Sequence, residues 1–429
     1  MLITPFSDQP TDALRTAVNS LRADRENVQR IWIFDPEQRR DDDPSPPAIS
    51  FGSDSGLRFV APFAPGRLMY FDAVTQKYRP AKRRTILGLD SNLCSLLREV
   101  FVHGSDDPTR TRRVIDLAKH ARIWRAEVQP MLYLRELVLR LPIADLRNDA
   151  EKAVVSMFKM QALRPQSSEG AGRLIFDEAI LDHFEERFGV RTFEEAASKQ
   201  VDLMLQKGDV GHAHDHIVIY AALLKMIDVG LAMKQRPLDE RLAEVDAFIV
   251  RDLASVQPRL HVLARLFFSG TLARLLKITA GNPNFGRKHL IGSSYDLYLT
   301  IIHENFLGTS DEPPEAWLSI LCTLDEGLSN YAGRFPLVSL AVMNDYSFRI
   351  AHQWDDAWLK NTLGVGRYDE LVRSVNERVP SVKTSWLTER TIAMIRDIEA
   401  RLGVTAEQSL LGDATAQYII AGTSFGRPA

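Results

Sequence analysis

Cysteine is scarce in this sequence of 429 residues. The chain has two cysteines, Cys94 and Cys322, which lie far apart and form no Cys-x-x-Cys pair. A disulfide-held scaffold and a zinc site built from cysteines are therefore excluded as the basis of the fold. So low a cysteine content is typical of a reducing compartment, and we expect a cytoplasmic protein.

Long hydrophobic runs are absent as well. An apolar stretch such as IVIYAALL at 217–224 is much shorter than the roughly 20 residues that a membrane-spanning helix needs. The opening stretch MLITPFSDQPTDALR has no basic segment followed by an apolar one, so it predicts no secretory signal peptide. We expect no membrane partner.

An excess of positive charge is the third absence. Lysine and arginine number 53 against 56 aspartate and glutamate residues, which gives a net charge of −3. The chain as a whole is therefore no polybasic nucleic-acid binder, although a local patch can still attract phosphate groups. We interpret the basic segment at 77–84 as a solvated loop, with contact to a nucleic-acid backbone as the alternative. Its basic residues are Lys77, Arg79, Lys82, Arg83 and Arg84.

The spacing of apolar residues indicates the fold class. A hydrophobic fraction of 45% and a charged fraction of 25% are globular values. Short apolar runs of strand type alternate with helical segments around the two ends of a long block with apolar residues at three- and four-residue spacing, which predicts helices. We predict an α/β protein with a parallel-sheet core. Its expected parts are a mixed α/β segment at 1–84, the core at 85–140 and 291–335, an all-helical insertion at 141–290 and a helical C-terminal region at 336–429.

Two segments of the predicted core share one design. ILGLDSN at 86–92 and SILCTLDEG at 319–327 are apolar, strand-like runs that each end in an aspartate, Asp90 and Asp325. Ligands bind at the carboxyl ends of strands in open parallel sheets, so these aspartates meet if the two strands are neighbours. Converging carboxylates repel one another unless a cation lies between them. Mg²⁺ or Mn²⁺ is expected, because both ions prefer oxygen ligands.

With these motifs the chain resembles the PIN-domain family, which comprises metal-dependent ribonucleases related in fold to flap endonucleases. The family opens with a strand that ends in an aspartate, a small residue and asparagine, as in LDSN at 89–92. A glutamate follows on a helix, as in QPMLYLRE at 129–136, and a third carboxylate lies near the start of a later helix, as in SSYD at 293–296. The last strand ends in a Thr-x-Asp pattern, as in TLD at 323–325.

The resemblance implies metal-assisted hydrolysis of phosphodiester bonds, with RNA as the expected substrate. It implies that Asp90 and Asp325 bind the metal most directly, and that Glu136 and Asp296 complete the shell or activate water. Thr323 and Asn92 would hold a carboxylate or a phosphate oxygen through hydrogen bonds. It further implies a role as a toxin or in phage defence. We expect the helical insertion to gate substrate or to bind a protein regulator.

Each of these acidic residues also has a purely structural interpretation. Asp90 and Asp325 have the sequence context of ordinary turns. Glu136 is flanked by arginine on its helix and suits a surface ion pair, and Asp296 suits the N-terminal turn of a helix. The segment at 141–290 also departs from compact members of the family, which have short connections there. The alternative prediction is a non-catalytic helical interaction protein with a degenerate core.

A histidine cluster provides a third, weaker hypothesis, in which the protein is a metallohydrolase with these histidines as metal ligands. His212, His214 and His216 surround Asp215 in the sequence HAHDH, which is similar to a metallohydrolase motif in composition but not in spacing. The cluster lies at a predicted helix start, where Asp215 suits the capping position. Asp215 also competes with Asp296 as the third carboxylate. We prefer Asp296, because the Thr-x-Asp segment follows it directly.

Overall fold

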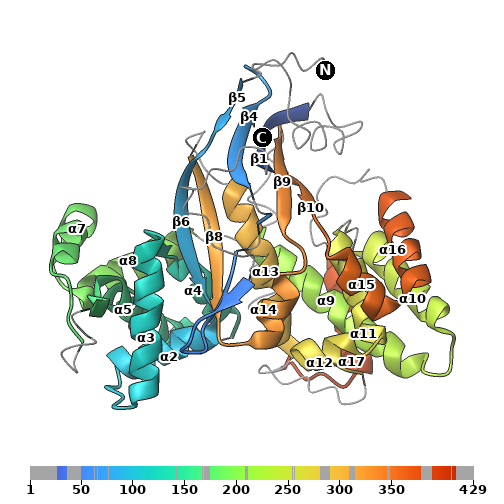
Figure 1. The fold of residues 1–429 in the computed structure, drawn as a ribbon. Coiled ribbons are helices and arrows are strands. Elements are labelled where there is room, and N and C mark those ends of the chain that lie inside the picture. Colours follow the sequence, from blue (N-terminus) through green and yellow to red (C-terminus); the bar gives the residue numbers. More distant parts are fainter. Residues whose placement is uncertain are drawn as a thin grey trace. The chain divides into compact units, whose positions relative to one another are not determined.

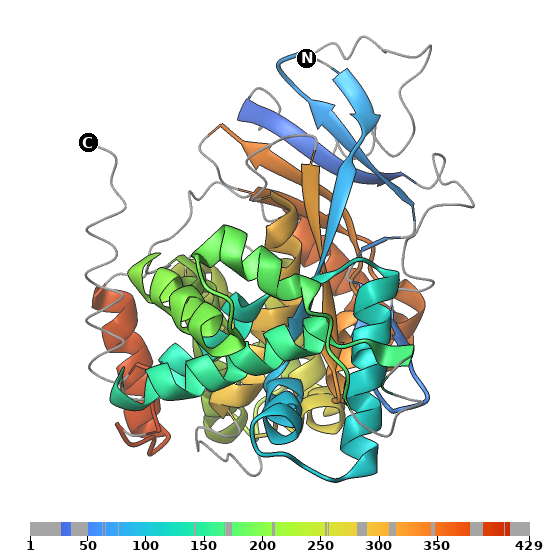
Figure 2. The ribbon, with the colours of Figure 1, turned by 90° about the vertical axis from the view of Figure 1, so that its left-hand side faces the viewer.

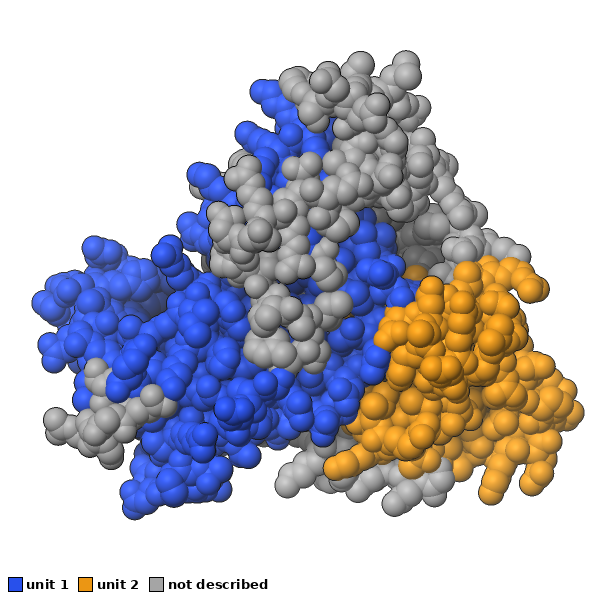
Figure 3. Space-filling model, viewed as in Figure 1, with its two compact units in different colours: residues 1–207, 299–354 blue, residues 208–298, 355–429 orange. Residues whose placement is uncertain are grey.

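The computed structural model describes residues 27–35, 50–280, 290–308, 315–344, 348–377 and 389–411. Short gaps within these ranges fall at 62, 65, 76, 141–142, 167, 169–173, 208–210, 254, 256 and 407. The chain divides into two compact units, one made of residues 1–207 and 299–354 and the other of residues 208–298 and 355–429 (Figure 3). Both β-sheets belong to the first unit.

The first sheet is antiparallel and has the strand order β10-β9-β1-β4-β5. Its central strand β1 contains the apolar run 31–34, in which Trp32 and Ile33 are fully buried. Trp32 packs against Tyr70 of the neighbouring strand at 4.8 Å between ring centroids. The bounds of its strands are β1 Val28–Asp35, β4 Arg67–Asp72, β5 Lys77–Pro80, β9 Leu337–Met343 and β10 Phe348–His352.

The second sheet has the order β2-β3-β8-β6-β7 and positions the candidate site. Its central pair, β6 and β8, is parallel in an unbroken register from Lys82 opposite Glu315 to Leu89 opposite Cys322. Strand β7 is also parallel to β6, whereas β3 runs antiparallel to β8. The bounds are β2 Ser50–Gly52, β3 Arg58–Val60, β6 Lys82–Leu89, β7 Glu127–Val128 and β8 Glu315–Thr323. Strand β6 follows β5 after one residue, so one ribbon runs through both sheets (Figure 1).

Helices of the first unit pack around the second sheet. Helix α5 contacts α2, α3 and α8 (Figures 1 and 2), and all four contribute to one apolar core that also includes residues of β6 and β8. Helix α4 contacts β6 directly. The bounds are α2 Ser91–Phe101, α3 Pro108–Ile123, α4 Pro130–Arg140, α5 Ile143–Ala162, α7 Ala179–Phe188, α8 Phe193–Lys207 and α14 Glu326–Ala332.

The described part of the second unit is helical. Helix α9 is buried along most of its length and contacts α10, α11 and α17. Helix α13, Gly292–Gly308, begins in this unit and continues into the first. The other bounds are α9 Gly211–Ala232, α10 Leu238–Ala247, the π-helical turn η3 Phe248–Asp252, α11 Pro258–Phe268, α12 Thr271–Leu276, α15 Asp356–Leu363, α16 Val365–Glu377 and α17 Glu389–Arg401.

The predicted α/β class is confirmed, and two local predictions are wrong. Residues 77–84 form β5 and the start of β6 and are no loop, because their polar side chains project from strands that are largely exposed there. Residues 337–352 form β9 and β10, so the C-terminal region begins with strands and not with helices. The helices expected at 141–290 occur, but they are divided between the two units, because α5, α7 and α8 belong to the first. The narrower PIN-like assignment of the core stays a prediction.

No helix among the described residues has both the length and the apolar character that crossing a bilayer requires.

The close approach at Gly88 fixes how α13 packs on β6. A Cβ atom at Gly88 would lie 2.7 Å from Cδ1 of Leu132 in α4 and would overlap the ring of His303 in α13. His303 is fully buried, its Nδ1 is hydrogen-bonded to the Ser319 hydroxyl, and burial lowers its pKa to about 3. The neutral imidazole therefore lies directly on the backbone of β6, two residues before Asp90.

We expect Gly88→Ala to lower the free energy of unfolding by about 1–3 kcal/mol, because a buried ring and a buried leucine must move. Gly366→Ala is the matched control, since Gly366 lies in α16 with open space where its Cβ would be. That change should stabilise the protein slightly through helix propensity. Urea unfolding of both variants measures the contrast, and equal stabilities would contradict the packing at Gly88.

Candidate functional site

The carboxyl ends of β6 and β8 lie side by side. The backbone N–H of Asp90 donates to the carbonyl oxygen of Cys322 at 3.1 Å, which continues the parallel ladder by one step. Asp90 is the first residue after β6, and Asp325 comes two residues after β8. The two strand-end aspartates are therefore brought to one edge of the sheet.

Asp90 is held on both of its carboxylate oxygens. It is the N-cap of α2, where Oδ1 accepts from the N–H of Leu93 at 2.8 Å. Its Oδ2 accepts from the hydroxyl of Thr323 at 2.5 Å. The residue is 1% exposed. The backbone of Leu324 also donates to this carboxylate. A carboxylate has about four lone-pair positions, so these bonds leave some acceptor capacity on the group.

Asp325 repeats this arrangement on the neighbouring strand. It is the N-cap of α14, where Oδ1 accepts from the N–H of Leu328 at 2.9 Å. Its own N–H donates to the Thr323 hydroxyl oxygen at 2.8 Å. Asp325 is only half-buried. The Thr323 hydroxyl therefore connects the two aspartates, because it accepts from Asp325 and donates to Asp90.

Burial raises the pKa of Asp90 to about 6, because the ionised carboxylate loses its hydration. Hydrogen bonds from Thr323 and Leu93 oppose this rise, and the negative charge of Asp325 adds to it. Near neutral pH Asp90 is thus a buried anion beside a second carboxylate. A cation at this edge would relieve both penalties.

Glu136 lies in the same buried region. It is 2% exposed on α4, the helix that packs on β6. The pKa of the Cys94 thiol is raised well above its ordinary value, first by burial and then by the charges of Asp90 and Glu136. Burial also raises the pKa of Tyr133 to about 12, and Glu136 contributes to that rise. The Cys94 thiol is thus within electrostatic reach of both carboxylates.

The remaining predicted site residues are placed as follows. Asn92 is exposed in the first turn of α2. Asp296 is half-buried in the second turn of α13, within the part of that helix that belongs to the second unit. Its membership of a site with Asp90, Glu136 and Asp325 therefore stays a prediction.

The donor chemistry at this edge suits a hard divalent cation. Mg²⁺ is commonly held by one or two carboxylates, with water and substrate phosphates completing its shell. Asp90 and Asp325 supply such a pair of oxygen donors. Within the ranges that the structure describes, no group of three or more His, Cys, Asp or Glu side chains is placed to hold a metal ion.

The histidine cluster contributes one described side chain to the second unit. His216 is buried in α9, and its Nε2 is hydrogen-bonded to the Ser294 hydroxyl at 2.8 Å. The side chains of His212 and His214 lie outside the described residues. Asp215 is the fifth residue of α9 and not its cap, because the helix begins at Gly211, and it accepts from Gln257 at 3.3 Å.

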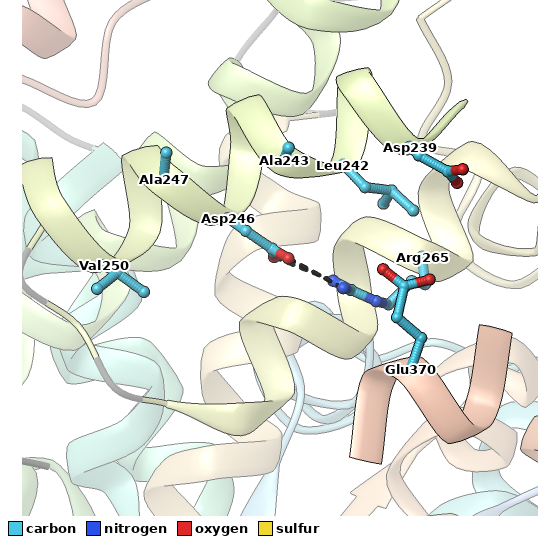
Figure 4. A pocket seen from close by; sticks show the side chains of 8 residues that line it. All are labelled: Asp239, Leu242, Ala243, Asp246, Ala247, Val250, Arg265 and Glu370. Carbon is cyan, nitrogen blue, oxygen red and sulfur yellow. Dashed lines mark hydrogen bonds and ion pairs between the residues drawn. The ribbon is translucent and has the colours of Figure 1, made fainter. Parts of the chain in front are cut away.

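A buried charge cluster in the second unit has no counterpart among the predicted sites. Asp246 of α10 accepts two hydrogen bonds from Arg265, at 3.0 and 2.9 Å, and one from Nδ1 of His261 at 2.6 Å. Asp246 and Arg265 line a pocket of about 400 Å³ with the exposed residues Asp239 and Glu370 (Figure 4). Burial raises the pKa of Asp246, but the two cationic partners outweigh it and hold the pKa below its ordinary value.

This cluster shows what sequence reasoning missed. His261 and Arg265 are four residues apart in α11, which places both on one face of that helix. This four-residue spacing of two basic side chains can be recognised in the sequence. Asp246 lies on another helix, and nothing in the local sequence around it indicates this partnership.

We predict that Asp90→Asn changes how stability depends on pH. A folded-state pKa near 6 lies about two units above the ordinary aspartate value, so ionisation of Asp90 destabilises the fold as pH rises through 6. Between pH 4 and 7 the wild type should lose about 2 kcal/mol of unfolding free energy that the neutral variant keeps. Denaturant unfolding across this range, in the presence of EDTA, measures the difference.

Asp107→Asn is the matched control, because Asp107 is also an aspartate N-cap, at the exposed start of α3. Its stability relative to wild type should vary little over the same pH range. A difference between wild type and Asp90→Asn that stays constant from pH 4 to 7 would contradict a raised pKa at Asp90.

We also predict that Asp246→Ala lowers the free energy of unfolding by about 3–5 kcal/mol, because it leaves buried Arg265 and His261 without their shared anion. Asp239→Ala, at an exposed position of the same pocket, should change it by less than about 0.5 kcal/mol. Urea titrations followed by circular dichroism test both values. Equal effects of the two substitutions would show that the cluster does not stabilise the second unit.

The chain was compared as a whole with other proteins. No protein-family model, no curated protein and no solved structure matches it. The resemblance to the PIN-domain family therefore rests on the sequence motifs alone.

Proposed function

We propose that this protein is a metal-dependent nuclease that hydrolyses phosphodiester bonds, with RNA as its substrate. One observation carries the proposal: Asp90 and Asp325 end two neighbouring parallel strands at the same edge of a sheet, joined through the Thr323 hydroxyl. Ligand sites of open parallel sheets lie at this edge. The order of acidic motifs along the chain, which resembles that of PIN domains, supports the same activity.

Asp90 and Asp325 would hold the metal ion, and the buried Glu136 would supply a third negative charge nearby. A bound Mg²⁺ or Mn²⁺ would lower the pKa of an attacking water and offset charge at the phosphorus. Thr323 fixes the orientation of Asp90, since its hydroxyl donates to Oδ2. The backbone N–H groups of Leu93 and Leu328 donate to Oδ1 of Asp90 and of Asp325 and hold these two oxygens in place.

The finer expectations belong to this proposal as well. Asp296 is proposed as a fourth acidic residue of a PIN-like core, and Asn92 as a contact to a phosphate oxygen. The helices at 141–290 are proposed to gate substrate or to bind a protein regulator. A cytoplasmic location and a role as a toxin or in phage defence accompany the resemblance.

The test is cleavage of an end-labelled, unstructured oligoribonucleotide by the full chain with millimolar Mg²⁺ or Mn²⁺. Asp90→Asn and Asp325→Asn should each slow cleavage at least about 100-fold, since each removes a charge that holds the metal ion. Binding of Mn²⁺, followed by calorimetry, should weaken in the same two variants. EDTA should abolish cleavage by the wild type.

Asp107→Asn again provides the control, because it changes an aspartate helix cap away from the sheet edge. It should cleave at the wild-type rate. Undiminished cleavage by Asp90→Asn, or no cleavage by the wild type with either ion, would contradict the proposal. In that outcome Asp90 and Asp325 act as helix caps without a catalytic role.

A further inference from the structure

A hollow of about 560 Å³ lies at the opposite end of the strands that carry Asp90 and Asp325. Its lining includes Arg83 and Arg84 of β6, Trp317 of β8, and Trp124 and Arg125 directly after α3. We call it the amino-edge hollow. Its volume is in the range of small-molecule sites, which is about 300–1,000 Å³. At about 3.3 Å per residue, Thr85 in its lining is roughly 16 Å along the strand from Asp90.

The lining of the amino-edge hollow carries more positive than negative charge. Three arginines line it, against one acidic residue, Glu127. Arg84 also pairs with Glu315, but its side chain remains 56% exposed. Arg125 is exposed and Arg83 half-buried. Guanidinium groups bind phosphate oxygens in pairs and stack on aromatic rings, so this lining favours an anion that also has a planar group.

Arg125 has a backbone conformation that ordinarily belongs to glycine. Its φ angle is 49°, in the left-handed region, directly after the end of α3. An L-residue with a Cβ atom is strained there, and glycine or asparagine is the common choice at this point of a helix end. A strained arginine beside a hollow is the kind of outlier that functional sites retain. Glycine would be unstrained at this position, so Arg125→Gly removes the side chain without a cost to the backbone.

Two tryptophans supply flat apolar surface to the amino-edge hollow. Trp124 contacts Phe59 edge-on, at 5.1 Å between ring centroids, and His120 at 5.3 Å. Trp317 is half-buried on β8, opposite Arg84 in the strand register. Unpaired nucleic-acid bases stack on such rings regardless of sequence, whereas bases in a duplex are already stacked on one another.

Exposed basic residues continue outward from the amino-edge hollow along the ribbon that joins the two sheets. Lys77 and Arg79 project from β5, and Lys82 from the start of β6. Residues two apart on a strand are on one face, about 6.6 Å from one another. Lys77 and Arg79 therefore place two positive charges on one face of β5, which suits a phosphate backbone.

We propose that the amino-edge hollow binds an unpaired nucleotide of single-stranded RNA. The base lies against Trp124 and Trp317, its phosphates contact Arg84 and Arg125, and the adjoining strand follows the basic residues of β5. This inference rests on the proposed function, because it names how the substrate of the nuclease is held. The hollow is separate from the carboxylate edge, so binding is measurable without hydrolysis.

The experiment measures fluorescence anisotropy of a labelled 12-nucleotide oligouridylate with the full chain, in EDTA and at low salt. Arg125→Gly should weaken binding at least about five-fold while its melting temperature is unchanged or higher, because glycine relieves the strained backbone. It should also reduce the slope of log K against log salt concentration by about 0.7. A merely structural role of Arg125 predicts neither binding effect.

Trp317→Leu should weaken binding about 5- to 100-fold, and Trp317→Phe should restore most of the loss, since phenylalanine keeps a stacking face. Arg112→Gln, which removes an exposed arginine of α3 outside the hollow, is the matched control and should bind like wild type. A duplex RNA of the same length should bind more weakly than the single strand.

Three outcomes overturn the inference: no binding of the oligouridylate by wild type, unchanged affinity of both Arg125→Gly and Trp317→Leu, or equal affinity for duplex RNA. Binding that depends on Arg125 and Trp317 in a protein that cleaves nothing would support the amino-edge hollow and refute the nuclease. Cleavage that needs Asp90, with affinity independent of both residues, would do the reverse.

Discussion

The parallel pairing of β6 with β8 is the constraint on which both proposed sites depend. Parallel strands in register bring like ends together, so one pairing defines a carboxyl edge with Asp90 and Asp325 and an amino edge with Arg83, Arg84 and Trp317. Antiparallel pairing would have placed the two aspartates at opposite ends of the sheet. The carboxylate pair and the amino-edge hollow are thus two consequences of one strand direction.

The buried hydroxyl of Thr323 makes this pairing chemically specific. It accepts a hydrogen bond from the backbone N–H of Asp325 at 2.8 Å and donates one to the carboxylate of Asp90 at 2.5 Å. Both aspartates also cap helices, which satisfies backbone N–H groups that a helix start leaves open. The oxygens that cap the helices are the same ones that would bind the metal ion of the proposed nuclease. Burial raises the pKa of Asp90 because the anion loses its hydration, and the hydrogen bonds to its oxygens oppose that rise.

The carboxyl edge was predictable because its information is local. A short apolar run followed by Asp-Ser-Asn or Thr-Leu-Asp identifies a strand end without knowledge of its neighbours. That β6 and β8 are neighbours had to be assumed, since Asp90 and Thr323 are 233 residues apart. The burial of Glu136 could not be predicted from its sequence segment, because charged residues flank it on the helix. Residues 77–84 were misjudged because their polar side chains are largely exposed on β5 and the start of β6 and show no clear apolar alternation. Residues 337–343 form a short buried apolar run, which periodicity alone does not distinguish from a buried helix segment.

The long separation between β6 and β8 also determines when the carboxyl edge comes into existence. At a synthesis rate of about 5–20 residues per second, the 233 residues between Asp90 and Thr323 take roughly 12–47 seconds to emerge. Throughout that interval the nascent chain contains β6 without its main partner. Long-range pairing of this kind is slow to form and leaves strand edges open to aggregation until it is complete. Whatever chemistry the two aspartates perform, it begins only after three quarters of the chain has been made.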